Sequence, residues 1–130
     1  MNATLPPSPS IPGILVVDDE QEAADALAQL LELLGYRTSV AYDGDAALAA
    51  VQEQRPEVVI LDLHMPMMGG VAACTRLRRQ EGPRMTIIAL TGSSLALDRE
   101  AAELAGFDHF LVKPLMLGAL VRLLPAIPGD

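Results

Sequence analysis

Short apolar runs alternate with amphipathic segments from Ile14 onward. The runs are rich in Val, Ile and Leu and are bounded by turn residues, a pattern typical of strands buried on both faces. Four of them span residues 14–17, 58–61, 86–90 and 110–112. Thr38 and Val40 alternate with polar neighbours, which predicts a fifth, half-exposed strand at an edge of the sheet.

Apolar residues between these runs recur at steps of three and four, the spacing of one helical face. The five stripes are Ala24, Leu27, Leu31 and Leu34; Ala47, Leu48 and Val51; Val71, Cys74 and Leu77; Leu97, Ala101 and Leu104; and Leu117, Leu120, Val121 and Leu124. Gly35 and Gly106 follow two stripes as helix stops, and Arg55-Pro56 ends another. Strict alternation of strand and helix predicts an α/β fold, with a doubly wound five-stranded parallel sheet and helices on both faces.

The length and composition fit one globular domain. The chain has 130 residues, of which 51% are hydrophobic, so disorder is excluded. Residues 1–13 are rich in Pro and Ser and are expected to form a flexible linker, followed by the domain at 14–124 and a short tail at 125–130. A single cysteine and the absence of a readable signal or apolar span indicate the cytoplasm, with no membrane contact by this domain.

The charge balance argues against nucleic acid as a partner. Nine basic residues are scattered among seventeen acidic ones, for a net charge of -8, whereas phosphate backbones are held by clustered Lys and Arg. Eight of the nine basic residues are Arg, and Lys113 is the only lysine. Lys113 is therefore a candidate for a specific role.

Polar residues follow the apolar runs at what should be one edge of the sheet. Asp18 and Asp19 follow the first run, Asp62 the run at 58–61, Thr91 the run at 86–90, and Lys113 the last. The carboxyl ends of parallel strands share one edge, where α/β folds form their sites. Three carboxylates, a hydroxyl and an ammonium are therefore expected to converge.

This combination favours phosphoryl chemistry. Neighbouring carboxylates oppose one another's ionisation, and a hard divalent cation, Mg²⁺ or Mn²⁺, relieves that cost. Beside such a cation, the ammonium of Lys113 is useful only if the site also binds an anionic group. A phosphoryl group, with Thr91 as a hydrogen-bond donor, meets this requirement. Asp62 is the best placed nucleophile for an aspartyl-phosphate.

These residues lie in motifs that resemble the receiver domain of bacterial two-component response regulators. The motifs are VVDDE at 16–20, DLHMPMMGG at 62–70, ALTG at 89–92 and FLVKP at 110–114, and the likeness covers residues 14–124. The resemblance implies a flavodoxin-like strand order 2-1-3-4-5. It also implies a module that catalyses its own phosphorylation and dephosphorylation without turning over a small-molecule substrate.

The resemblance assigns a role to each residue at the expected edge. Asp62 would accept phosphate from a histidine kinase or a histidine phosphotransfer domain. Asp19, Asp62 and the backbone carbonyl of His64 would bind Mg²⁺ directly, with Asp18 helping through water. Thr91 and Lys113 would contact the phosphate.

Further assignments concern switching and the lifetime of the phosphoryl group. Thr91 and Phe110 match the positions whose side chains respond to phosphorylation. The Lys113-Pro114 bond is expected to be cis, so that a tight turn aims the ammonium across the strand ends. His64 and Ser93 would flank the path of the attacking water and, lacking an amide or carboxylate, would make the phosphoryl group long-lived.

Two other classes and the wider context stay open at this point. Asp62-Leu63-His64 matches the start of the D-x-H-x-x-G pattern of cobalamin-binding modules, although Met67 stands at the glycine position. Aspartate-nucleophile phosphatases carry D-x-D after the first strand, where this chain has adjacent aspartates. The position of the linker favours the last domain of a hybrid histidine kinase over a single-domain regulator. Because Arg122 is the only charge in the final helix, at most a weak homodimer is expected.

Overall fold

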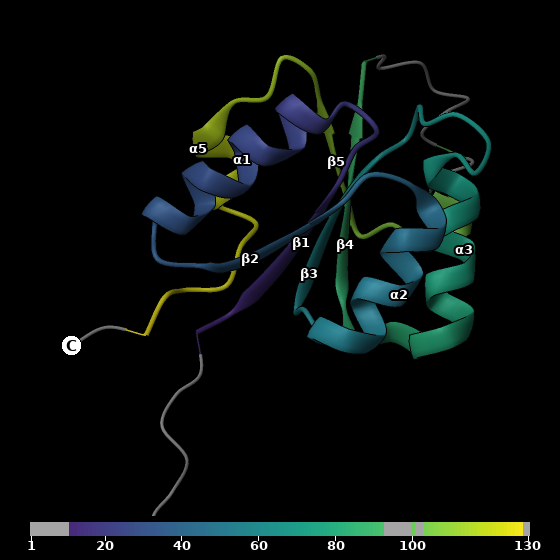
Figure 1. Ribbon diagram of the computed structural model, residues 1–130, viewed down its shortest axis with the longest axis horizontal. Helices are drawn as coiled ribbons and strands as arrows, with labels where there is room; N and C mark the ends of the chain where they lie inside the picture. The colour runs from purple at the N-terminus through teal and green to yellow at the C-terminus, as the bar shows by residue number, and fades with distance from the viewer. Residues whose placement is uncertain (1–10, 93–99, 101–102, 129–130) are drawn as a thin grey trace, which may run out of the picture.

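Five parallel strands form one sheet in the order β2-β1-β3-β4-β5 (Figure 1). The computed structural model describes residues 11–92, 100 and 103–128. The strands are β1 Gly13–Val17, β2 Arg37–Ala41, β3 Val58–Asp62, β4 Thr86–Thr91 and β5 His109–Val112. The predicted parallel sheet and its strand order are both confirmed.

Helices cover both faces of the sheet. They are α1 Gln21–Leu33, α2 Gly44–Gln54, α3 Gly70–Glu81 and α5 Leu117–Val121, and a 3₁₀ turn, η1 Gly82–Arg84, follows α3. In Figure 1, α1 and α5 lie on one side of the sheet and α2 and α3 on the other. The fold is therefore doubly wound, as the alternation of strands and helices predicts.

The side chains of each central strand divide between two aliphatic cores. In β1, Leu15 and Val17 pack with α2 and α3, whereas Ile14 and Val16 pack with α1 and α5. All four are 1% exposed or less. Because both faces of the strand are covered, every position of β1 is apolar, which explains its unbroken apolar sequence.

The predicted apolar stripe of α1 is correct except at its last member. Ala24, Leu27 and Leu31 are buried against the sheet. Leu34 is 44% exposed and lies beyond the helix as its C-cap, so its assignment to the buried face is wrong. Gly35 follows with φ +108°, a left-handed conformation that glycine adopts without strain and that turns the chain out of the helix.

The final helix is shorter than the stripe ending at Leu124 predicts. Beyond Val121 the amides of Leu123 and Leu124 donate three residues back, at 2.9 and 3.1 Å, which is the tighter 3₁₀ pattern. Pro125 follows, and a proline disfavours helical backbone in the residue before it. The hydroxyl of Tyr36 then donates to the carbonyl of Pro125 at 2.7 Å and ties this turn to the start of β2.

Several boundaries differ from the sequence prediction. Gly13 is the first residue of β1 and so does not belong to a linker, while residues 1–10 lie outside the described residues. Leu104 is 84% exposed, which contradicts its place on a buried stripe. Leu97 and Ala101, predicted for the same stripe, lie outside the described part of the chain. Within the described ranges, no helix has the length and apolarity needed to cross a membrane.

Candidate functional site

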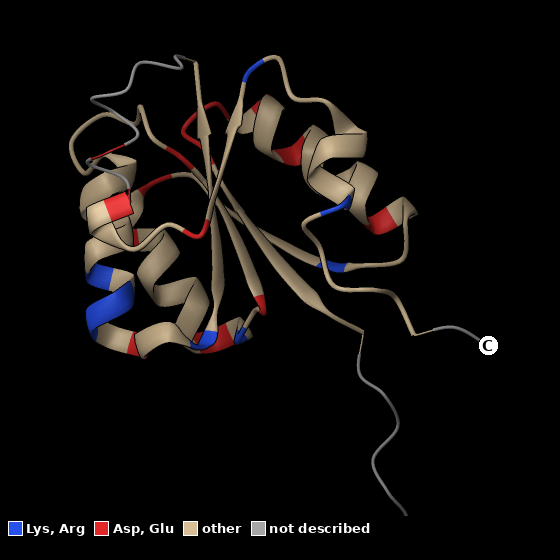
Figure 2. Ribbon diagram, turned by 180° about the vertical axis from the view of Figure 1, so that it is seen from behind, with Lys and Arg blue, Asp and Glu red and all other residues tan. Residues whose placement is uncertain are grey.

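The carboxyl edge of the sheet brings together polar residues from four strands. Asp18 directly follows β1, Asp62 ends β3, Thr91 ends β4 and Lys113 directly follows β5. Asp18, Asp62 and Thr91 are the buried polar residues at this edge, each 5% exposed or less. Figure 2 shows acidic segments in the loops at the arrowhead end of the strands, together with a basic segment in the loop that follows β5. The predicted convergence is present.

Three carboxylates form the centre of this edge. One ligand oxygen from each of Asp18, Asp19 and Asp62 lies within 4.8 Å of the others. Burial raises the pKa of Asp18 above its ordinary value, and the charge of Asp62 adds to this effect. Such a set of crowded, partly desolvated carboxylates fits a hard divalent cation such as Mg²⁺, which prefers oxygen ligands.

Each oxygen of Asp62 has a distinct donor. Oδ1 accepts the backbone N–H of His64 at 2.9 Å, and Oδ2 accepts the ammonium of Lys113 at 2.9 Å. Lys113 also lies 3.9 Å from Asp18. Partial burial disfavours the charged ammonium, but the hydrogen bond to Asp62 and the nearby carboxylate charges outweigh that effect and raise the pKa of Lys113. Lys113 therefore stays protonated beside Asp62.

The backbone around Lys113 holds its side chain over the edge. Its amide donates to the carbonyl of Thr91 at 2.7 Å and so continues the pairing of β4 with β5. The Lys113-Pro114 peptide bond is cis, as predicted. The Lys113 side chain is 37% exposed, so an incoming anion can reach it from solvent.

Three further residues predicted for the site are Thr91, His64 and Phe110. The hydroxyl of Thr91 lies 3.5 Å from Nε2 of His64, a residue whose side chain is otherwise exposed. Phe110 on β5 is partly buried, and its ring centroid lies 6.2 Å from that of Phe107. Ser93, predicted to act with His64, lies outside the described residues.

Gly70 is a residue of this site that the sequence analysis did not single out. A Cβ on Gly70 would overlap the backbone carbonyl oxygen of Asp62 and would lie 2.6 Å from the Cα of Leu63. The Gly70 amide donates to the Leu63 carbonyl at 3.0 Å. Only glycine allows α3 to begin this close to the end of β3. The signal in the sequence was the glycine pair just before an amphipathic segment.

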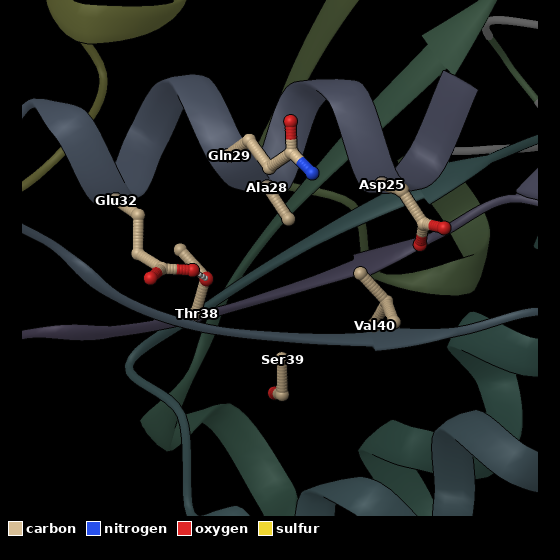
Figure 3. A pocket seen from close by; sticks show the side chains of 7 residues that line it. All are labelled: Asp25, Ala28, Gln29, Glu32, Thr38, Ser39 and Val40. Carbon is tan, nitrogen blue, oxygen red and sulfur yellow. Dashed lines mark hydrogen bonds between the residues drawn. The ribbon is translucent and has the colours of Figure 1, made fainter. Parts of the chain in front are cut away.

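A separate pocket of about 240 Å³ lies between α1 and the edge strand β2, away from this site (Figure 3). Its two carboxylates already have hydrogen-bond donors: Asp25 accepts from Tyr42 at 2.6 Å, and Glu32 accepts from Thr38 at 3.1 Å. It contains none of the residues predicted for the site. This pocket is therefore not part of the site predicted from the sequence.

Comparison with known proteins identifies the family. Residues 14–124 match the family model described as the response regulator receiver domain. The chain belongs to this family. Receiver domains accept a phosphoryl group on an aspartate in two-component signalling, and neither the cobalamin-binding nor the phosphatase alternative is favoured.

Curated relatives include two mycobacterial regulators. The chain is 38% identical over 118 residues to the transcriptional regulatory protein PrrA of Mycobacterium leprae, covering 91% of this chain and 50% of that protein. It is 36% identical over 114 residues to the response regulator MprA of Mycolicibacterium vanbaalenii, covering 88% and 49%. The receiver domain thus spans about half the length of the curated relatives it matches.

Solved structures show the same architecture. The chemotaxis protein CheY4 of Vibrio cholerae superposes with a TM-score of 0.83 at 30% identity, covering 88% of this chain and all of the other. A response regulator from Burkholderia pseudomallei, solved with a phosphorylated aspartic acid, a calcium ion and citrate, superposes with a TM-score of 0.79 at 29% identity, covering 85% and 65%.

Proposed function

We propose that Asp62 is the phosphoacceptor of this receiver domain and that it takes its phosphoryl group from a phosphohistidine in a Mg²⁺-dependent reaction. The observation that carries the proposal is the position of Asp62 between the other two carboxylates and Lys113. One of its oxygens is 2.9 Å from the only ammonium side chain of the protein, and its other oxygen is oriented by the His64 amide. Asp18 and Asp19 each lack this pairing at hydrogen-bond distance.

The transfer forms one bond and breaks one. A carboxylate oxygen of Asp62 attacks phosphorus, the P–N bond to the donor histidine breaks, and its electron pair returns to the imidazole nitrogen, which takes up a proton. The ammonium of Lys113 is placed to offset charge on the phosphoryl oxygens, and the hydroxyl of Thr91 to donate a hydrogen bond to one of them. The receiver domain catalyses this transfer to itself and its later hydrolysis.

A cation site beside Asp62 supports the magnesium requirement. Asp18, Asp19, Asp62 and the backbone carbonyl of His64 are the groups that would hold the ion, and the convergence of three carboxylates within 4.8 Å matches its preference for oxygen. When bound, Mg²⁺ supplies positive charge that neutralises the phosphoryl oxygens. The carboxylates of Asp18 and Asp19 keep that charge next to the acceptor oxygen.

Thr91 and Phe110 are the proposed switch residues. Phosphorylation adds negative charge next to Thr91 at the end of β4, and Phe110 lies on the adjacent strand with Ala89 as its paired neighbour. A movement of Thr91 toward the phosphoryl group would vacate space for the Phe110 ring and shift a pre-existing equilibrium. The affected surface would be the one formed by the predicted fourth helix, β5 and α5. Most of that helix lies outside the described residues.

The donor is proposed to be a histidine kinase or a histidine phosphotransfer domain in the cytoplasm. The excess of acidic residues makes nucleic acid an unfavourable direct partner for this domain. The hybrid-kinase context and a weak homodimer stay predictions.

Phosphorylation of a single aspartate tests the proposal. Incubation with acetyl phosphate and Mg²⁺ should add one acid-labile phosphoryl group, detected by intact-protein mass spectrometry and mapped to Asp62. Asp62→Asn should abolish it, while Asp45→Asn, which alters an exposed carboxylate in the first turn of α2, should leave it unchanged. Labelling of Asp62→Asn at the wild-type rate would refute the assignment.

The lifetime of the phosphoryl group is the second measurable property. Because neither His64 nor Ser93 carries an amide or carboxylate to orient water, we propose that hydrolysis is slow. Combining His64→Asn with Ser93→Glu should shorten the lifetime after the donor is removed. An unchanged or longer lifetime would show that these side chains do not control the attacking water.

A further inference from the structure

Arg78 of α3 joins three separate segments through its guanidinium group. Nε donates to the carbonyl of Gly106 at 2.9 Å, and Nη1 donates to the carbonyl of Met85 at 2.8 Å and to that of Gly82 at 3.3 Å. Nη2 donates to the Asp108 carboxylate at 2.7 Å. The Arg78 side chain is only 18% exposed. This is the most extensive side-chain hydrogen-bond set among the described residues, and it lies outside the phosphorylation site.

The backbone conformation of Gly106 and its lack of a side chain make room for Arg78. It has φ +111°, and a Cβ there would lie 2.8 Å from Cγ of Arg78 and 3.1 Å from its Nε. The absence of a side chain thus lets the stem of Arg78 pass directly over the residue. A planar guanidinium can reach several acceptors in fixed directions, which an ammonium on a flexible stem cannot do.

Asp108 links Arg78 to the sheet. Its Oδ2, held by Arg78, also accepts the backbone N–H of Ile87 at 2.8 Å, while its own N–H donates to the Ile87 carbonyl at 2.8 Å. Asp108 immediately precedes β5 and Ile87 lies in β4. The two hydrogen bonds therefore define where the pairing of β5 with β4 begins.

The start of β5 matters for the site because β5 is a short edge strand. It spans His109–Val112 and pairs only with β4, in the register that sets Thr91 opposite Val112. Lys113 follows directly, so its position depends on that register. A shift of one residue moves a strand by about 3.3 Å and turns its side chains to the opposite face. Such a shift would remove the ammonium from its 2.9 Å contact with Asp62.

We propose that Arg78 is a positioning residue for phosphoryl transfer: by holding Asp108 it fixes the start of β5 on β4, and through β5 it places Lys113 at Asp62. The proposal rests on the proposed function, since it assigns the effect to the Lys113–Asp62 pair. Arg78 touches neither the acceptor nor the carboxylate cluster. Its loss should therefore slow the transfer without weakening cation binding, since an ammonium displaced from Asp62 competes less with the cation.

The first test compares Arg78→Gln with Arg79→Gln, its exposed neighbour on α3. The rate of phosphorylation at saturating acetyl phosphate should fall about tenfold in Arg78→Gln, equivalent to one lost charge-assisted contact in the transition state. The dissociation constant for Mg²⁺, from an amide chemical-shift titration, should not rise above that of wild type, because Asp18 and Asp19 are untouched and a displaced Lys113 competes less for Asp62. Arg79→Gln should match wild type in both measurements.

Amide hydrogen exchange measures whether Arg78 holds the start of β5 on β4. The amides of Ile87 and Asp108 should exchange faster in Arg78→Gln, whereas amides in β1 should be unaffected. Should Arg78→Gln fail to fold, Asp108→Asn serves as the second variant. It keeps an oxygen acceptor for Ile87 but loses the charge that holds Arg78. The same slower transfer, with no weakening of Mg²⁺ binding, is expected.

A double-mutant cycle separates positioning of Lys113 from general loss of stability. In a Lys113→Ala background, Arg78→Gln (or Asp108→Asn) should change the phosphorylation rate by less than about twofold, since the residue through which Arg78 acts is gone. A full additional loss in that background, or a wild-type rate in both single variants, would overturn the proposal. If Lys113→Ala alone leaves the rate unchanged, the proposed role of Lys113 in the function fails instead.

Discussion

The close approach of Gly70 to the end of β3 leads to a direct test of how the site is built. Gly70→Ala places a methyl group against the carbonyl of Asp62, at 2.6 Å from the Cα of Leu63 and 2.9 Å from the carbonyl carbon of Asp62. All three neighbours are backbone atoms, so no side-chain rotation relieves the overlap. Either β3 or the start of α3 has to move.

Two opposing effects determine how much Gly70→Ala changes the free energy of unfolding. Glycine to alanine within a helix ordinarily stabilises a protein by about 0.5–1 kcal/mol, because it reduces the freedom of the unfolded chain. Forcing extra volume into a well-packed site costs about 1–3 kcal/mol. We expect the free energy of unfolding of Gly70→Ala to fall by about 1–2 kcal/mol. Gly118→Ala in α5, where a Cβ meets nothing within 4 Å, should instead raise it by up to about 1 kcal/mol.

Urea denaturation followed by circular dichroism at neutral pH measures both variants. Because the carbonyl of Asp62 is one of the displaced atoms, Gly70→Ala should also slow phosphorylation by acetyl phosphate, and Gly118→Ala should not. Equal stabilities for the two variants, or an unfolding free energy of Gly70→Ala at or above wild type, would refute the reasoning from steric overlap.

Three other outcomes can be checked independently. Burial raises the pKa of the Cys74 thiol to about 11, so at pH 8 only about one folded molecule in a thousand carries the thiolate. Labelling of Cys74 by a disulfide reagent should therefore require unfolding, and rapid labelling of the native protein would contradict this. The Asp43 side chain caps α2 by accepting a hydrogen bond from the Ala46 amide at 2.7 Å. Asp43→Ala should therefore lower the free energy of unfolding, measured by urea denaturation, by about 1 kcal/mol. An unchanged urea midpoint with an unchanged slope of the transition would refute the cap. Lys113→Met removes the ammonium that competes with Mg²⁺ for Asp62. In a chemical-shift titration Mg²⁺ should therefore bind more tightly to this variant, while phosphorylation slows. Weaker Mg²⁺ binding would count against the site.

The hydrophobic pattern was sufficient to predict the sheet and most of the site. Strands covered on both faces are apolar at nearly every position, so the runs at 14–17, 58–61 and 86–90 stand out without any structure. Parallel strands end at a common edge, and that rule places Asp18, Asp62 and Lys113 together although they are far apart in the chain. The geometry of the fold, more than any single motif, made these predictions succeed.

Other features depended on how the finished elements pack, which periodicity does not encode. Leu34 and Leu104 continue apolar spacings, yet both are exposed, Leu34 because it lies past the end of α1 as its C-cap. The tight approach at Gly70 and the hydrogen bonds of Arg78 to Gly106 and Asp108 arise between segments distant in sequence. A sequence specifies which residues can bury apolar surface, because that depends on local spacing. Which backbone atoms come within hydrogen-bond distance of a buried side chain is decided only when the helices have docked on the sheet.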